Sequence, residues 1–116
     1  VLNALGSLAP NPDLLAATSR AVTDAIGEDG LLVMPTTPQT AFAHGGVPPA
    51  TQADFTSLSN IAGLPALACP AGRGADGLPV SVQLVGPKGS ETRLISFARC
   101  LEPALGGAIL PEGVTS

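Results

Sequence analysis

Residues 54–86 limit what this chain can fold into more than any other stretch, because they place apolar segments between sharp backbone breaks. Pro65 lacks an amide proton and restricts Leu64 to extended geometry. A short helix that begins after Asp54 should therefore stop at about Ala62.

Two strands are expected after this break. The apolar run 66–70 predicts a buried strand, and the alternation of apolar and polar side chains over 80–85 predicts a strand with one face in a core. The connection between them contains Asp76 and three glycines, which favours a hairpin whose loop is longer than a tight turn.

The first part of the chain predicts a helix followed by a strand. Asn11 is a side-chain cap, Pro12 suits the first helical position, and glycines at 27 and 30 supply the stop. Residues 31–34 form a short apolar run between turn residues, as expected for a strand buried on both faces. The predicted apolar face of the helix consists of Leu14, Leu15, Thr18, Val22, Ala25 and Ile26.

A long loop and a last helix complete the expected elements. Prolines and glycines interrupt residues 35–53, and a loop of this length in a compact domain is functional or disordered. Ser90 is expected to cap the last helix, and Pro103 to kink or end it before a tail over 106–116. The expected buried face of this helix is Leu94, Ile95, Ala98, Leu101 and Leu105.

The order helix, strand, loop, helix, strand, strand, helix predicts an α/β fold, with helices packed on a β-sheet. At 116 residues the chain forms a single segment, 1–116, long enough to bury a core.

Several linked motifs resemble the C-terminal part of amidase signature enzymes, the family that includes amidases and proteins like the A subunit of glutamyl-tRNA amidotransferase. These motifs are LVMPTTP at 32–38, DFT at 54–56, NIAGLPA at 60–66, CPAG at 69–72 and GLPVSVQLVGP at 77–87. Their order and spacing hold from about residue 31 to residue 102. The resemblance implies that the chain supplies the last strands and covering helices of that fold, as helices packed on a small mixed β-sheet. This sheet should have open edges where the absent strands belong.

The same resemblance implies amide hydrolysis through an acyl-enzyme, without a metal or an organic cofactor. Family members use two serines and a lysine in a glycine- and serine-rich signature, and this chain lacks that signature. No catalytic residue is therefore assigned, and the chain alone is expected to be inactive. Its role would be to complete the sheet and wall the cavity for a small amide substrate.

Two residues are expected to contact substrate. The aspartate that matches Asp54 faces the substrate's amino group in some amidotransferase relatives, and a carboxylate there would pair with a cationic group. Asp54 could equally cap the helix that follows it, and the two roles are compatible. Phe42 lies on the long loop, which in relatives is near the substrate cavity, and it either packs or lines a substrate pocket.

The sequence gives little support for other catalytic arrangements or for a metal site. A triad through His44, the only histidine, or a Lys88–Ser90 pair would require geometry that the sequence does not indicate. One histidine and two separated cysteines do not make a zinc site. Cys69 and Cys100 are expected to be buried free thiols, which fits a cytoplasmic origin.

The amino-acid composition limits the kinds of molecule that the chain could bind. A net charge of −4 and five scattered cations offer no footprint for nucleic acid, and no apolar run is long enough to span a membrane. Charged residues make up 12% of the chain, about half the usual fraction, so part of its surface should be interior to something larger. The partner would be the missing N-terminal catalytic part or, if the chain is a non-catalytic interaction module, further copies in a homo-oligomer.

Overall fold

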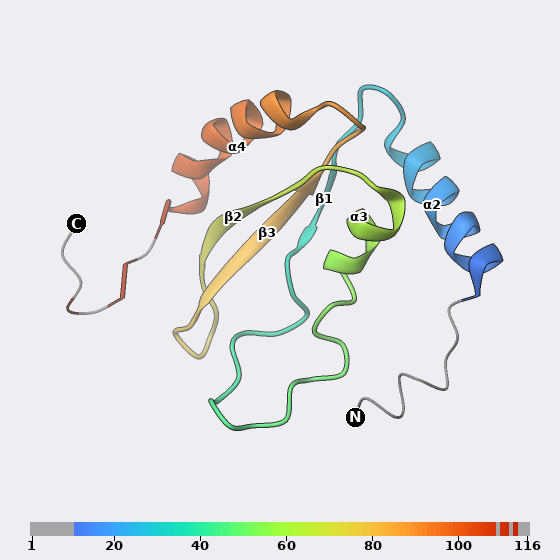
Figure 1. Ribbon diagram of the computed structural model, residues 1–116. Helices are drawn as coiled ribbons and strands as arrows, with labels where there is room; N and C mark the ends of the chain where they lie inside the picture. The colour runs from blue at the N-terminus through green and yellow to red at the C-terminus, as the bar shows by residue number, and fades with distance from the viewer. Residues whose placement is uncertain (1–10, 109, 112, 114–116) are drawn as a thin grey trace.

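The computed structural model describes residues 11–108, 110, 111 and 113. The elements follow one another in the expected order (Figure 1). Those that precede the long loop are α2 (Pro12–Ile26) and β1 (Leu32–Pro35). The elements that follow the loop are α3 (Thr56–Ala62), β2 (Ala66–Arg73), β3 (Pro79–Val85) and α4 (Glu91–Leu105). The helix expected to stop at about Ala62 is α3, which ends there at Gly63 in the left-handed conformation.

The three strands form one sheet in the order β1-β3-β2, with β3 in the centre. Both pairings are antiparallel. The α/β class is confirmed, but the sheet that was expected to be mixed is antiparallel throughout its three described strands. The reason is topological: β1 and β2 run in the same direction, and β3 lies between them, so no parallel pair is formed.

The expected hairpin is β2 and β3. Its register shifts between Pro70 and Arg73, where the strand pairing is irregular. The loop closes through a hydrogen bond from the Gly74 amide to the Leu78 carbonyl (2.8 Å) and one from the Gly77 amide to the Gly74 carbonyl (2.9 Å). Gly77 has a φ of 79°, which a side chain would disfavour, so the glycine-rich joint is needed for this turn.

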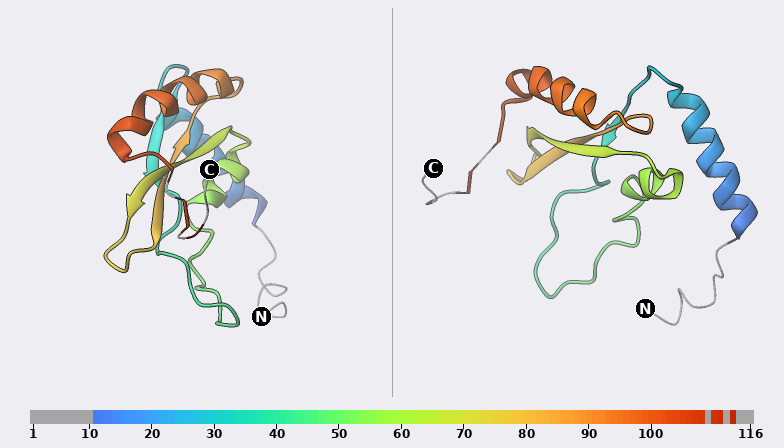
Figure 2. Two further views of the ribbon diagram at one scale, coloured as in Figure 1. Left: turned by 90° about the vertical axis from the view of Figure 1, so that its left-hand side faces the viewer. Right: turned by 45° about the horizontal axis from the view of Figure 1, so that its top comes forward.

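Helices cover the two faces of the sheet unequally. Figure 2 shows α4 on one side of the sheet, and α3 and α2 toward the other. On the α4 side, Leu84 and Cys69 pack against Leu94. On the opposite side, Val85 packs with Ile26 of α2 and with Leu64 after α3. The central strand therefore contributes to two separate small cores through two consecutive residues, Leu84 and Val85, whose side chains point to opposite faces of the sheet.

α2 begins as expected but does not bury the expected face. The Asn11 side chain accepts hydrogen bonds from the Asp13 amide (3.0 Å) and the Leu14 amide (3.3 Å), which confirms it as the cap. Of the 15 residues of α2, only Ile26 is buried, and Leu14 is 64% exposed. The predicted apolar face is therefore left mostly uncovered within this chain, because only its C-terminal end, Val22 and Ile26, reaches the core.

β1 is not buried on both faces, which corrects a second expectation. Its residues alternate between half-buried and exposed, and Val33 is 53% exposed. Val33 pairs with Leu84 and so lies on the face that α4 covers over β2 and β3. β1 is the edge strand farthest from β2, so among the described elements neither another strand nor α4 shields its outer side.

α4 follows the predicted pattern with three differences. Ser90 is the residue before the helix, but its hydroxyl makes no capping hydrogen bond. Ile95, which was expected to be buried, is exposed, whereas its neighbour Leu94 is only 2% exposed. The reason is that the side of α4 that packs against the sheet is the side that carries Leu94. Pro103 lies inside the last turn, and the helix continues to Leu105 and ends at Gly106 (φ 89°). The remaining expected residues, Ala98, Leu101 and Leu105, are half-buried against the Leu84–Leu94 core.

No helix within the described ranges is long and apolar enough to cross a membrane.

Candidate functional site

The long loop between β1 and α3, residues 36–55, is anchored at both ends to the central strand. At its start, the Thr36 amide donates to the Ser81 carbonyl (3.1 Å), and the Ser81 hydroxyl donates to the Thr36 hydroxyl (3.0 Å). At its end, the buried Gln83 side-chain amide donates to the Phe55 carbonyl (3.4 Å). Polar positions on β3 thus hold a segment that has no regular structure of its own.

The outgoing and returning halves of the loop are also joined to each other. The Gln39 side-chain amide donates to the side-chain carbonyl of Gln52. The Thr37 hydroxyl donates to the Gln39 carbonyl (2.8 Å), which holds the turn that presents Gln39. The Gln39–Gln52 hydrogen bond therefore closes the loop two residues before Asp54. The structure shows an ordered loop and not a disordered one.

A further contact ties the loop to the tip of the β2–β3 hairpin. The Thr40 hydroxyl donates to the carboxylate of Asp76, whose other oxygen accepts from the Leu78 amide (3.0 Å). The hydrogen bond from Thr40, followed by that from Leu78, lowers the pKa of Asp76 from its ordinary value. Asp76 therefore remains an acceptor near neutral pH, and it shapes the hairpin turn and holds the loop together.

Phe42 lies beyond this tie, in the part of the loop between Thr40 and Gln52. Its side chain is 43% exposed, so it is a partly covered aromatic surface and not a core residue. His44 is exposed in the turn that follows, where the Gly46 amide donates to the Ala43 carbonyl (3.1 Å). Whether Phe42 lines a substrate pocket stays a prediction.

Asp54 does not cap α3, which corrects one of its two expected roles. The residue before the helix is Phe55, whose backbone is already helical (φ −85°, ψ −39°), and no side chain caps the helix. The first turn is instead supported by the Ala53 carbonyl, which accepts from the Ser57 amide at 2.9 Å. Asp54 is exposed, and its carboxylate has no hydrogen-bond or ion-pair partner among residues 11–108.

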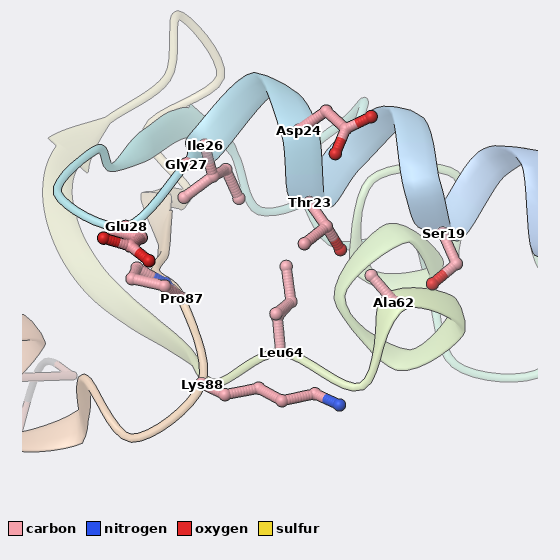
Figure 3. A pocket seen from close by; sticks show the side chains of 10 residues that line it. All are labelled: Ser19, Thr23, Asp24, Ile26, Gly27, Glu28, Ala62, Leu64, Pro87 and Lys88. Carbon is pink, nitrogen blue, oxygen red and sulfur yellow. The ribbon is translucent and has the colours of Figure 1, made fainter.

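Of the cavities formed by the described residues, the largest lies elsewhere, between α2, the end of α3 and the turn before α4, with a volume of about 600 Å³ (Figure 3). Thr23 and Leu64 point into it, and Lys88 extends beneath Leu64 while Glu28 lies at the opposite end. Its apolar floor is Ile26, Ala62 and Leu64, and the other polar groups on its wall are Ser19 and Asp24. Neither Asp54 nor Phe42 contributes to this cavity, so the sequence-predicted residues and the largest cavity are separate.

The side chains considered for catalysis are not brought together. Across the described residues, neither Lys88 nor His44 forms a hydrogen bond with a serine or threonine hydroxyl. The Ser90 hydroxyl is buried without a partner and packs against Gly86, where a Cβ atom would lie 2.3 Å from its oxygen. In the same ranges, no group of three or more histidine, cysteine or acidic side chains is arranged to hold a metal.

The two cysteines are free, as expected, but they differ in exposure. Cys69 on β2 is buried, and this burial, with the Glu102 carboxylate nearby, raises the pKa of its thiol. Cys100 on α4 is exposed, which corrects the expectation that both would be buried. The sheet-facing side of α4 is defined by Leu94, Ala98, Leu101 and Leu105, and Cys100 falls outside that row.

Sequence reasoning missed the residues that organise the loop. Gln83 occupies a polar position of an alternating strand, a pattern that fits a solvated face as well as a buried anchor. Asp76 precedes Gly77, which signals a turn but not a contact with Thr40, 36 residues away. The Gln39–Gln52 bridge has no local signal, since long-range polar pairing depends on how the chain folds back.

Comparison with known proteins identifies the family to which the chain is similar. The profile of the Amidase family matches residues 14–95. Over 88 residues the chain is 42% identical to the A subunit of glutamyl-tRNA(Gln) amidotransferase from Nitrobacter hamburgensis, covering 71% of this chain and 18% of the relative. Over 97 residues it is 39% identical to the protein of the same name from Roseobacter denitrificans, covering 76% of this chain and 19% of that protein.

Solved structures agree with this assignment. The crystal structure of the A subunit of glutamyl-tRNA(Gln) amidotransferase from Thermotoga maritima matches with a TM-score of 0.77 at 27% identity, over 98% of this chain and 28% of that chain. The 6-aminohexanoate cyclic dimer hydrolase matches with a TM-score of 0.60 at 30% identity, over 80% of this chain and 23% of that chain. The chain thus spans less than a third of the length of each of these relatives.

Proposed function

The chain belongs to the Amidase family, and from this membership we propose that it forms the C-terminal part of an amide hydrolase. In this proposal the segment 1–116 completes the sheet and walls the substrate cavity, and a serine–serine–lysine machinery elsewhere in the enzyme breaks the amide bond. The observation that carries the proposal is the match over 98% of this chain to only 28% of a solved relative. The outer edges of β1 and β2, open in the described part of the chain, and the bare face of α2 support it.

Asp54 and Phe42 are the residues that we propose to contact the substrate. The Asp54 carboxylate is exposed and unpaired in the described chain, so it is available to a cationic group of a small amide substrate. Phe42 offers a partly covered aromatic face on the same loop. The free thiols of Cys69 and Cys100 support a cytoplasmic location for the protein.

A segment exchange tests this function. The matching segment of the Nitrobacter hamburgensis protein, at 42% identity, is replaced by this chain, and hydrolysis of small amides is measured. We expect the exchanged enzyme to retain turnover, and the enzyme with the segment deleted to have none. A folded exchange protein without turnover would contradict the proposal.

Two substitutions within the exchanged segment test the site residues. Asp54→Asn should raise KM for a substrate that carries an amino group, with kcat little changed, because the lost ion pair is a binding contact. Phe42→Ala should weaken binding of substrates with apolar side chains. The isolated chain should not hydrolyse amides, and turnover abolished by Lys88→Ala or His44→Ala would contradict the view that catalysis lies elsewhere.

A second candidate is a non-catalytic module that associates with itself. The observations that favour it are the outer edge of β1, unpaired in the described sheet with Val33 exposed, and the exposed leucines of α2. Exposed strand edges and apolar surface are commonly covered by a second copy in a symmetric dimer. Light scattering over a concentration series tests this candidate: a twofold mass supports a homodimer, and a monomer at every concentration opposes it.

A further inference from the structure

A second cavity lies between the long loop and the β2–β3 hairpin, and we call it the hairpin–loop cleft. Its volume is about 400 Å³, within the range of small-molecule sites. Residues 37–41 of the loop form one wall, and residues 79–82 with Ala71 form the other, next to Pro35. The cleft therefore lies where the loop is tied to the central strand and to the hairpin tip.

The lining of the cleft is entirely uncharged. Three prolines, at positions 35, 38 and 79, together with alanine and valine side chains, provide its apolar surface. Its polar side chains are Thr37, Gln39, Thr40 and Ser81, which are all neutral. The Asp76 carboxylate lies outside the lining, and both of its oxygens already accept hydrogen bonds, from Thr40 and Leu78. A charged ligand group would lose its water in this cleft without finding an opposite charge in the lining, which is costly. The larger cavity differs in this respect, since Asp24, Glu28 and Lys88 line it.

The hydroxyl groups of the cleft are oriented by bonds within the protein. Thr37 donates to the Gln39 carbonyl, Thr40 donates to Asp76, and Ser81 donates to Thr36. Each hydroxyl proton is thus in use, and each oxygen retains acceptor capacity. The polar side of the cleft accordingly suits a ligand that donates hydrogen bonds. An uncharged primary amide has such N–H donors.

The contact between Thr40 and Asp76 also sets the width of the cleft. Thr40 belongs to the loop wall, and Asp76 belongs to the hairpin that carries the opposite wall. Next to this contact, a Cβ atom added at Gly74 would lie 3.1 Å from the Thr40 methyl carbon, so the two walls meet closely here. The site is therefore preformed by the fold.

We propose that the hairpin–loop cleft binds the uncharged aliphatic part of an amide substrate, with its N–H groups directed at the threonine and serine oxygens. This proposal rests on the proposed function and deepens it, because it names the class of amide. Neutral aliphatic amides should be preferred to acids or amines of the same length.

The test is a titration of the ¹⁵N-labelled full chain with hexanamide, hexanoate and hexylamine. We expect hexanamide to shift the backbone amide signals of residues 39–41, 71 and 80–82, and to bind at least about 10-fold more tightly than either charged analogue. Equal binding of the three compounds, shifts confined to the cavity that contains Lys88, or no shifts at all would overturn the proposal.

Variants distinguish binding of hexanamide in the cleft from unspecific binding to apolar surface. Ala71→Leu should fill the cleft and reduce hexanamide binding by about 10-fold or more, whereas Ala75→Leu, at an exposed hairpin position, should leave binding unchanged. If Ala71→Leu disturbs the whole spectrum, Thr40→Val serves instead, because it removes both the Thr40 acceptor and the hydrogen bond to Asp76 that sets the width of the cleft, and either loss should weaken hexanamide binding. Unaltered binding in the folded cleft variant would contradict the proposal. These outcomes concern binding to this chain alone, so they are distinct from failure of the segment exchange.

Discussion

α4 and α2 are both 15-residue helices with apolar residues at helical spacing, yet they are covered to different extents within this chain. α4 packs on the sheet from Leu94 in its first turn to Leu105 in its last, whereas α2 packs only at its C-terminal end. Leu94 is 2% exposed against β2 and β3, whereas Leu14 of α2 is 64% exposed. Both helices are specified locally to a similar degree, so the difference lies in what the rest of the chain places beside them. α2 presents a surface that this segment does not cover, as expected for a chain that matches only part of longer relatives.

The largest effect should come from truncating the side chain that packs α4 on the sheet. Leu94→Ala should lower the free energy of unfolding by about 2–5 kcal/mol, because it leaves a cavity in a closed core. Leu14→Ala is the matched control and should change stability by less than about 0.5 kcal/mol. Urea unfolding of both variants provides the measurement. Equal destabilisation would mean that α2 is as well covered as α4.

The reactivity of the two thiols tests how well α4 covers the sheet. Cys100 should react with an alkylating reagent nearly as fast as in the unfolded chain, because it is exposed on α4. Cys69 should react at least about 100-fold more slowly, because it is buried and its thiolate is disfavoured, so the core must open first. The rates are read by mass spectrometry over time. Similar rates at both positions would show that α4 does not close over β2.

Loss of the helix caps should have a smaller effect, and here α2 should be the more sensitive helix. Asn11→Ala should cost about 1 kcal/mol of local stability in α2, because two amide protons lose their acceptor. Ser90→Ala should be within about 0.5 kcal/mol of neutral, because its hydroxyl has no hydrogen-bond partner in the described part of the chain. Hydrogen exchange of the amides in the first turn of each helix distinguishes the two. Loss of protection in α4 alone would reverse this assignment.

The smallest effect is expected at Asp54. Asp54→Ala should change the free energy of unfolding by less than about 0.5 kcal/mol, because its carboxylate is exposed and supports no helix end. A loss of about 1 kcal/mol would instead indicate a cap. The same substitution is also measured for substrate binding in the exchanged enzyme. Weaker binding without a loss of stability would indicate that Asp54 has a functional role and not a structural one.

Much of the fold was accessible from the sequence because its signals are local. Asn11 and Pro12 start a helix, and Pro65 limits the extent of another through its own covalent geometry. The alternation over β3 and the glycines of the hairpin predicted an antiparallel pair that the structure contains. The family could also be identified, because the motifs match in order as well as in type.

The candidate site was less accessible, because its contacts join residues that are distant in sequence. Nothing near Thr40 indicates that it contacts Asp76, and nothing near Gln83 indicates that it holds the Phe55 carbonyl. Asp54 was placed at a helix start by residue preference, but the preceding turn had already taken up helical geometry at Phe55. Preferences for single positions cannot foresee such a shift.

By itself, the sequence determined where α2 begins and where α3 ends, since proline, glycine and capping side chains act on their neighbours in the chain. Only the tertiary structure decided which apolar faces are covered and how the long loop is held. The fuller coverage of α4 than of α2 and the bridge from Thr40 to Asp76 depend on the distances between segments. These distances follow from β3 lying at the centre of the sheet, where it contacts both neighbouring strands and anchors both ends of the loop.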